Sequence, residues 1–181
     1  MSNLITIEYA RKVTVDYDRP LGDAVRRAGI RHNLAALVQW LHAIEVEAPE
    51  SGTEEVEMVL REVPGLDPFT ASPDETIARL EEIGKEDPRL RPATQKEGLA
   101  FIEQEPYFAE QYIIAASGTI FGVRREEDTE PRPQDIPCFF NTDQGLALYG
   151  LFWLIDQQKE EDAGGLPPVF FLFVREPTPQ N

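Results

Sequence analysis

A short stretch in the middle of the chain, residues 90–121, carries the densest set of signals for where elements begin and end. Thr94 stands three residues before Glu97, the spacing of a capping box, in which the hydroxyl accepts the Glu97 N–H and the carboxylate accepts the Thr94 N–H. Apolar residues then supply one helix face, and Pro106 cannot continue the helix. An uncharged apolar run follows, which we expect to be a strand over residues 112–123. The stretch therefore predicts a strand, a helix and a second strand joined by tight turns.

The clearest helix start in the chain is the Ser-Pro-Asp-Glu run at residues 72–75. The serine suits the N-cap, the proline suits the first helical position, and the acids face the positive end of the helix dipole. Glu75 completes a second capping box, and Gly84 is expected to end the helix. We also expect an exposed ion pair between Glu75 and Arg79, which are four residues apart on one helix face.

The remaining elements follow from alternation and helical spacing. Two hairpins are expected, one across a Pro-Glu-Ser-Gly turn at residues 49–52 and one across residues 141–145. Two more helices are expected over residues 18–28 and 33–43, with Asp18 as a cap for the first. The predicted strands outside the central stretch are residues 4–7, 12–17, 44–48, 56–63, 136–140, 146–155 and 169–175.

Together these patterns predict an α+β fold, a mostly antiparallel sheet with about three or four helices packed on one side of it. The length of 181 residues fits one domain with a substantial core, and no internal repeat divides the chain. We therefore expect a single domain over residues 1–176 and a loose tail over residues 177–181.

Charge and cysteine content narrow the classes of function. The chain has 33 acidic and 17 basic residues, a formal charge of -16, which argues against direct nucleic-acid binding because phosphate contacts need clustered Lys and Arg. It has one cysteine, no signal-peptide pattern at its start and no apolar run of about eighteen residues that could span a membrane. We expect a cytoplasmic protein with no membrane contact.

A catalytic centre would rest on Cys138, with His32 and His42 as candidate bases, or on the acidic cluster. A nucleophilic thiol needs a neighbouring base, but Cys138 lies in an apolar strand, where a buried and inert thiol is the usual outcome. The spacing of the histidines matches no zinc motif, and the chain has neither a calcium loop nor a glycine-rich phosphate loop. We expect no metal and no cofactor.

Four residues are candidates for binding rather than catalysis. Arg91 and Arg175 each end an apolar element, and Arg91 beside Glu97 can form a bidentate pair, which favours a structural clamp. Alternation along the strand predicted at residues 146–155 turns Trp153 away from its two neighbours and exposes it to a partner. The candidate binding residues are Arg91, Glu97, Trp153 and Arg175.

Three motifs resemble a family of uncharacterised bacterial proteins. They are Val-Thr-Val-Asp-Tyr at residues 13–17, Leu-Arg-Pro-Ala-Thr at residues 90–94 followed by Glu97, and Phe-Leu-Phe-Val-Arg at residues 171–175. The resemblance covers most of the chain. Because these proteins have no assigned activity, it implies no catalytic residues.

The chain departs from that family at two places, since residues 31–44 look more helical and residues 85–89 look inserted. A more distant likeness is to C-type-lectin-like and sulfatase-modifying-factor folds, which implies a small mixed sheet with a helix against it in the second half. Such a likeness concerns the fold and does not transfer a function.

The sequence favours a non-catalytic interaction or accessory module in the cytoplasm, with another protein as its expected partner. Two alternatives stay open. One is an acidic, nucleic-acid-mimicking inhibitor of a basic partner, although a charge run is more often a solvated face. The other is a hydrolase-like enzyme that uses Cys138 with a histidine.

Overall fold

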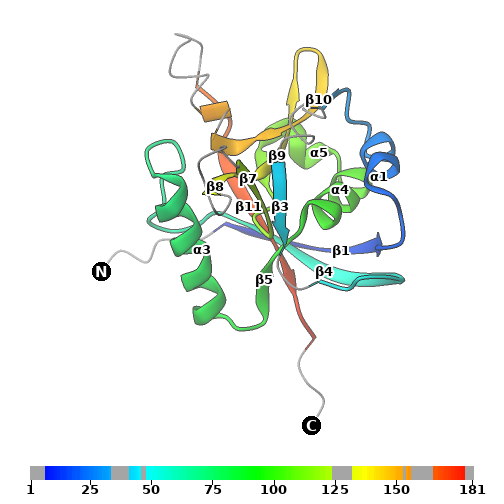
Figure 1. Ribbon diagram of the computed structural model, residues 1–181, viewed down its shortest axis with the longest axis horizontal. Coiled ribbons are helices and arrows are strands. Elements are labelled where there is room, and N and C mark those ends of the chain that lie inside the picture. The colour runs from blue at the N-terminus through cyan, green and yellow to red at the C-terminus, as the bar shows by residue number, and fades with distance from the viewer. Residues whose placement is uncertain are drawn as a thin grey trace.

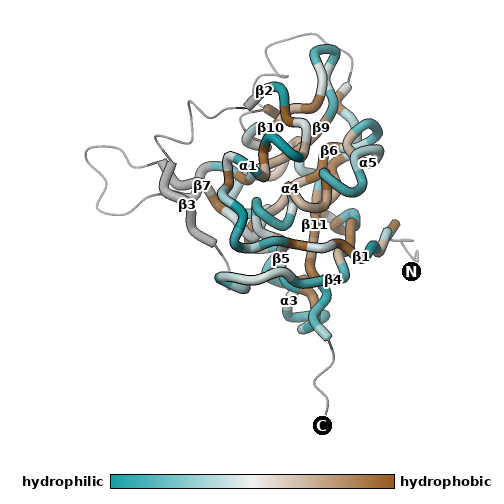
Figure 2. Tube along the Cα trace, turned by 90° about the vertical axis from the view of Figure 1, so that its right-hand side faces the viewer, coloured by the Kyte–Doolittle hydropathy of each residue, from teal (hydrophilic) through white to brown (hydrophobic). Residues whose placement is uncertain are grey.

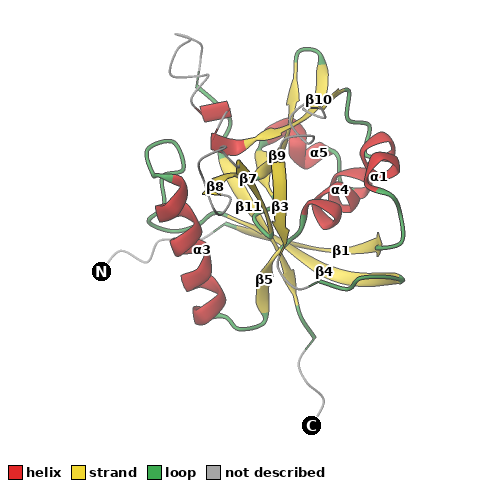
Figure 3. Ribbon diagram, in the orientation of Figure 1, coloured by secondary structure: helices red, strands yellow, loops and turns green. Residues whose placement is uncertain are grey.

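Short strands make up most of the elements in the computed structural model of the protein (Figure 1; Figure 3). The structure describes residues 7–33, 41–45, 48–123, 132–152, 154–155 and 165–177, and gives only the backbone of residues 32–33, 41–45, 121–123 and 132–134. The helices are α1 (Leu21–Arg27), α3 (Pro73–Glu86), α4 (Gln95–Gln104) and α5 (Tyr107–Gln111). The strands are β1 (Glu8–Asp16), β2 (His32–Asn33), β3 (Leu41–Glu45), β4 (Thr53–Arg61), β5 (Leu90–Pro92), β6 (Ile113–Ala115), β7 (Thr119–Val123), β8 (Arg132–Asp135), β9 (Pro137–Thr142), β10 (Gly145–Gly150) and β11 (Val169–Arg175).

These strands form two sheets. The larger has eight strands in the order β1-β4-β11-β6-β9-β10-β2, with β5 paired to β11 beside that path. Its pairs are antiparallel except for β11 with β6 and β10 with β2. The smaller sheet has the order β3-β7-β8 and is antiparallel. The predicted α+β fold with a mostly antiparallel sheet is therefore confirmed.

The large sheet is covered by helices on both faces, so the prediction that they lie on one side is wrong. Residues of α1, α4 and α5 belong to one buried cluster, whereas α3 contributes Leu80 and Ile83 to a second cluster. The reason is β11, whose apolar run is buried on both sides and needs cover on both. Figure 2 shows this hydrophobic strand in the interior of the molecule.

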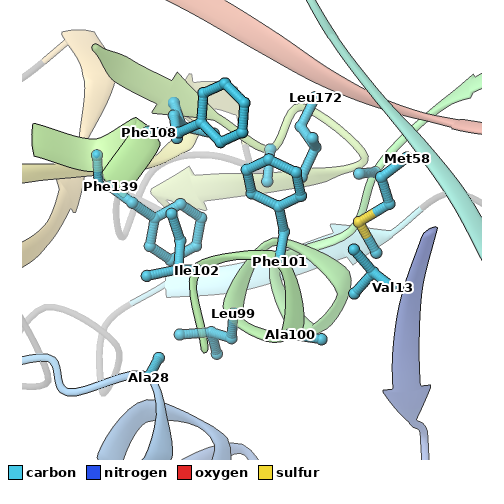
Figure 4. Packing of buried hydrophobic residues seen from close by; sticks show 14 of the residues in the cluster. Val13, Ala28, Met58, Leu99, Ala100, Phe101, Ile102, Phe108, Phe139 and Leu172 are labelled. Carbon is cyan, nitrogen blue, oxygen red and sulfur yellow. The ribbon is translucent and has the colours of Figure 1, made fainter. Parts of the chain in front are cut away.

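Helix α4 packs closely on the sheet (Figure 4). Its buried face carries Leu99, Phe101 and Ile102, which meet the sheet residues of the first cluster. A methyl group at Gly98 would lie 2.6 Å from the Phe139 ring, so only glycine allows this approach. The position of α4 against β9 therefore depends on Gly98 as well as on its apolar face.

Strand β1 lies at one end of the large sheet, and its outer edge is partly closed by a side chain from α4. The Thr14 N–H donates to Gln104 Oε1 at 3.0 Å, and Gln104 Nε2 donates to the Thr14 carbonyl at 2.9 Å. The Gln104 amide thus makes the two bonds that a neighbouring strand would make at this position.

Both predicted capping boxes are present. Ser72 accepts the Glu75 N–H while Glu75 accepts the Ser72 N–H, and Thr94 and Glu97 do the same at the start of α4. The predicted strand at residues 169–175 and the hairpin across residues 141–145 are also confirmed, the latter as β9 with β10.

The predicted hairpin between residues 44–48 and 56–63 is wrong, because β3 pairs with β7 while β4 lies between β1 and β11. The predicted helix over residues 33–43 is also wrong where it is described, since β2 ends at Asn33 and β3 begins at Leu41. The apolar residues of this stretch have helical spacing, but residues 41–45 form a strand because they pair with β7, which is distant in the sequence. Residues 34–40 and the strand predicted at residues 4–7, apart from Ile7, lie outside the described residues.

The strand predicted at residues 146–155 ends at Gly150, and residues 151–152 and 154–155 are helical. The Asp135 carboxylate lies beside this change and accepts the N–H of both Ile136 and Phe152. It also occupies the space that a side chain at residue 150 would need. The strand predicted at residues 112–123 is likewise two strands, β6 and β7, because the chain turns between them.

Two local side-chain predictions are also wrong. Asp18 does not cap α1, since its carboxylate accepts the Gly52 N–H at 3.1 Å and Pro20 holds the N-cap position without a side-chain bond. Arg79 does not pair with Glu75, whose carboxylate bonds Ser72. Its guanidinium instead bonds two later acids of the helix, Glu82 at 2.8 Å and Glu86 at 3.3 Å.

Candidate functional site

The start of α4 gathers most of the charged groups that the sequence singles out. Thr94 is the N-cap and Glu97 lies in the first turn, so the capping box fixes both side chains. Arg91 reaches them from β5, which is held in place by its pairing with β11. Tyr17 comes from the residue that follows β1. Three elements, β1, β5 and α4, therefore meet at one carboxylate.

Glu97 is the centre of this network, and none of its side chain is exposed. Arg91 binds it in a bidentate manner, with Nη1 at 2.9 Å from Oε2 and Nη2 at 2.6 Å from Oε1. The Tyr17 hydroxyl donates to Oε1 at 2.6 Å, and the Thr94 N–H donates to Oε2 at 2.8 Å. Both carboxylate oxygens are therefore fully occupied by donors of the protein itself.

The electrostatics fix the protonation state of the network. Burial by itself raises the pKa of Glu97, but the bonds from Arg91, Tyr17 and Thr94 outweigh it and hold that pKa below its usual range. Burial and the neighbouring Glu97 carboxylate raise the pKa of Tyr17 well above its usual range. At neutral pH Glu97 is thus a carboxylate and Tyr17 a phenol. Neither group is poised to take or release a proton.

Further bonds tie this network to the rest of the fold. Arg91 Nε donates to Glu176 at 3.0 Å, and Lys96 Nζ donates to the Tyr17 carbonyl at 2.6 Å. The side chain of Arg91 is 17% exposed, so solvent reaches only its outer part. The geometry is that of a buried clamp between β1, β5 and α4, as the sequence predicts for Arg91 with Glu97.

Arg175 belongs to a different set of contacts. Its Nη1 donates to Glu57 and its Nη2 donates to Glu8, each at 2.8 Å. The residue thus joins the end of β11 to β4 and β1 instead of joining Arg91 and Glu97. Trp153, the fourth predicted binding residue, lies outside the described residues.

Cys138 is fully buried, in the middle of the large sheet between β6 and β10. Burial, with the nearby Asp135 carboxylate, raises the pKa of its thiol well above the usual range, so the group is a thiol and not a thiolate at neutral pH. His32 lies on β2 and His42 on β3 of the smaller sheet, and only their backbones are described.

Within the described ranges, no three side chains of His, Cys, Asp or Glu are grouped so that they could hold a metal ion. The same part of the chain contains no helix with the length and apolar character needed to cross a membrane.

The sequence did not point to one concave feature of the structure, which we call the proline groove. It has a volume of about 370 Å³ and is lined by the segment between β4 and α3 and by the start of β11. The only signal in the sequence is the density of prolines, which marks an irregular connector. The groove is lined by Glu62, Val63, Pro64, Gly65, Leu66, Asp67, Pro68, Pro168, Val169 and Phe171.

Comparison of the chain with models of known protein families, with curated proteins and with solved structures finds no match. The resemblance to uncharacterised bacterial proteins and the likeness to C-type-lectin-like folds therefore stay predictions.

Proposed function

We propose that the protein is a non-catalytic interaction module that binds another protein through its surface. One observation carries this proposal: both oxygens of Glu97 are bonded by Arg91, Tyr17 and Thr94, which leaves no position for a substrate. The charged cluster best placed for chemistry is therefore used to hold three elements together. The proline groove, in contrast, is open and can receive a partner.

We also propose that this module works in the cytoplasm of a bacterial cell. A single cysteine suits a reducing compartment, and the three motifs at residues 13–17, 90–94 and 171–175 resemble uncharacterised bacterial proteins. The strong negative charge favours partners with a basic surface, because opposite potentials speed association.

The test is a stoichiometric complex with a purified partner. Tagged protein, cross-linked in the cells that produce it, yields candidate partners, and each is then purified and titrated by calorimetry. A saturable complex of fixed stoichiometry, with neither protein chemically altered afterwards, supports the proposal. A partner that is consumed or modified, with the tagged protein turning over, contradicts it.

The alternative of a hydrolase-like enzyme can be tested separately, through the reactivity of Cys138. A nucleophilic thiol must be reachable and ionised, so it should react with a thiol reagent in the folded protein. We expect labelling to be slow without denaturant and to become fast when the protein unfolds, followed by mass spectrometry. Fast labelling of the folded protein would support the alternative of a hydrolase-like enzyme that uses Cys138.

The acidic-mimic alternative rests on the charge of -16. Several acids are held by cations of the same chain, such as Glu103 by Arg19 and Arg27 and Glu55 by Lys12. Such pairing leaves fewer carboxylates to imitate a phosphate backbone. A complex with a DNA-binding protein that dissociates on modest salt addition would favour the mimic.

A further inference from the structure

The proline groove combines an apolar floor with an acidic rim. Val63, Val169 and Phe171 are buried residues that form its lining, and Leu66 lies partly exposed beside them. Its two charged lining residues, Glu62 and Asp67, are both acidic. A ligand that fits must therefore offer an apolar group for the floor and positive charge for the rim.

The walls of the groove are held in shape before any ligand arrives. Pro64 and Pro68 restrict the backbone, and the Leu66 N–H donates to the Val63 carbonyl at 3.1 Å. The Asp67 carboxylate accepts the Phe69 N–H at 3.0 Å, which closes the next turn. A preformed groove loses little conformational entropy when it binds.

Among the described residues, no cation forms an ion pair with either acid of the rim. Within the described part of the chain, no side chain donates to Glu62, and the Asp67 carboxylate accepts only the Phe69 N–H and the Thr70 hydroxyl. A nearby cation, Arg79, donates to the Pro64 carbonyl, but its charge is matched by two other acids of α3. The rim therefore keeps a negative potential.

Five of the ten residues that line the groove offer a ligand no backbone N–H. Pro64, Pro68 and Pro168 have no N–H, and the N–H groups of Glu62 and Leu66 donate to carbonyls of the protein. An anion bound here would meet two carboxylates. This chemistry selects a cationic ligand and rejects an anionic one.

We propose that the proline groove binds an extended segment of a protein partner in which one apolar side chain stands between Lys or Arg residues. The inference rests on the proposed function and names the chemistry of its partner. The apolar side chain covers the floor at Val63 and Phe171, and the flanking cations lie against Glu62 and Asp67. A small polyamine would satisfy the rim alone and leave the apolar floor open to water.

The test uses capped heptapeptides with the sequence Gly-Gly-Lys-Leu-Lys-Gly-Gly, and nuclear magnetic resonance of the full-length protein. We expect saturable shifts confined to the amides of residues 62–71 and 168–171. Peptides with the leucine replaced by serine, or with both lysines replaced by glutamates, should bind more weakly. Equal binding of the glutamate peptide, equal shifts with spermidine, or no shifts in these residues would each overturn the proposal.

Variants separate the groove from general charge attraction. The double variant Glu62→Gln, Asp67→Asn should weaken binding of the lysine peptide about fivefold, because two exposed ion pairs are lost. The matched control is the double variant Glu50→Gln, Glu54→Gln, which removes two charges from exposed residues that do not line the groove. We expect the control to bind nearly as the unchanged protein does, and an equal loss in both would overturn the proposal.

The same double variant distinguishes failure of this inference from failure of the proposed function. If a purified protein partner binds the double variant and the unchanged protein equally well, the groove is not its docking site. The protein would then still be an interaction module, with another surface in use.

Discussion

The two capping boxes of the protein have the same motif and nearly the same backbone, yet they lie in opposite environments. The N-cap of α3, Ser72, has φ -70° and ψ 160°, and the N-cap of α4, Thr94, has φ -72° and ψ 166°. In both boxes the carboxylate accepts the N-cap N–H at 2.8 Å. The two helix starts therefore have nearly the same N-cap geometry, although only α3 has a proline in its first turn.

Their surroundings differ. Ser72 and Glu75 are exposed, and water can replace either partner of their bonds. Glu97 is buried and has acquired two partners from outside its helix, Arg91 and Tyr17. A carboxylate without water needs such partners, because an unpaired buried charge is costly. The comparison shows that the motif sets where a helix begins, whereas distant residues set how much stability depends on it.

The largest expected effect is that of Glu97→Ala. The substitution leaves Arg91 mostly buried with only Glu176 as a partner, so we expect a loss of about 4 kcal/mol in the free energy of unfolding. Urea unfolding followed by circular dichroism measures this loss. Glu75→Ala is the matched variant at the exposed box, and a comparable loss there would mean that burial is not what separates the two boxes.

Tyr17→Phe isolates one of the distant partners. The change removes only the hydroxyl that donates to Glu97, a hydrogen bond to a charged group, so we expect a loss of about 2 kcal/mol. The same unfolding measurement applies. Tyr112→Phe is a suitable control. The Tyr112 hydroxyl is only partly buried, and its one hydrogen bond among the described residues is to the Tyr9 hydroxyl at 3.4 Å. If both substitutions lower the free energy of unfolding equally, the bond from Tyr17 to Glu97 is no stronger than an ordinary hydrogen bond between two hydroxyls.

The two N-caps should differ by a smaller amount. Thr94→Ala should cost about 2 kcal/mol and Ser72→Ala about 1 kcal/mol, since water can satisfy the freed N–H only at Ser72. Unfolding of both variants under one set of conditions checks the order. If Ser72→Ala costs more, exposure does not govern the strength of a cap in this protein.

The smallest effect concerns the dependence of stability on pH. The folded state lowers the pKa of Glu97 below its ordinary value of 4.5, so the carboxylate stabilises the fold fully above that pH and loses its effect as the pH falls through the folded pKa. Thermal unfolding of Glu97→Gln between pH 6 and 3 should therefore show a shallower decline than the unchanged protein. Glu75 has a pKa shifted in the same direction, but it is open to solvent. Glu75→Gln should change the slope less, and a larger change there would contradict this ranking.

How far the sequence predicts the structure depends on how far apart the interacting residues lie in the chain. Helices α3 and α4 follow from caps and spacing within a few residues, and so does the pair of Arg91 with Glu97. The part played by Tyr17 does not, because it lies 80 residues before its partner. The pairing of β3 with β7 was missed for the same reason, and a local hairpin was expected in its place.

The proline groove shows the same limit for a binding feature. Its two sides, residues 62–68 and 168–171, are brought together only because β4 pairs with β11 in one register. The sequence marks the prolines but not what they face. Exposure of Trp153 stays a prediction, since the strand on which it depended ends at Gly150.

The bond of Gln104 to Thr14 has a consequence for the protein at high concentration. An uncovered edge strand lets the sheet of one molecule continue into the sheet of the next, which is how aggregates and fibrils begin. Here the amide of a helix side chain already fills the place of the next peptide unit at Thr14. A second molecule that approached this edge would find its run of hydrogen bonds interrupted there, so crowded copies of the chain can collide along β1 and separate again.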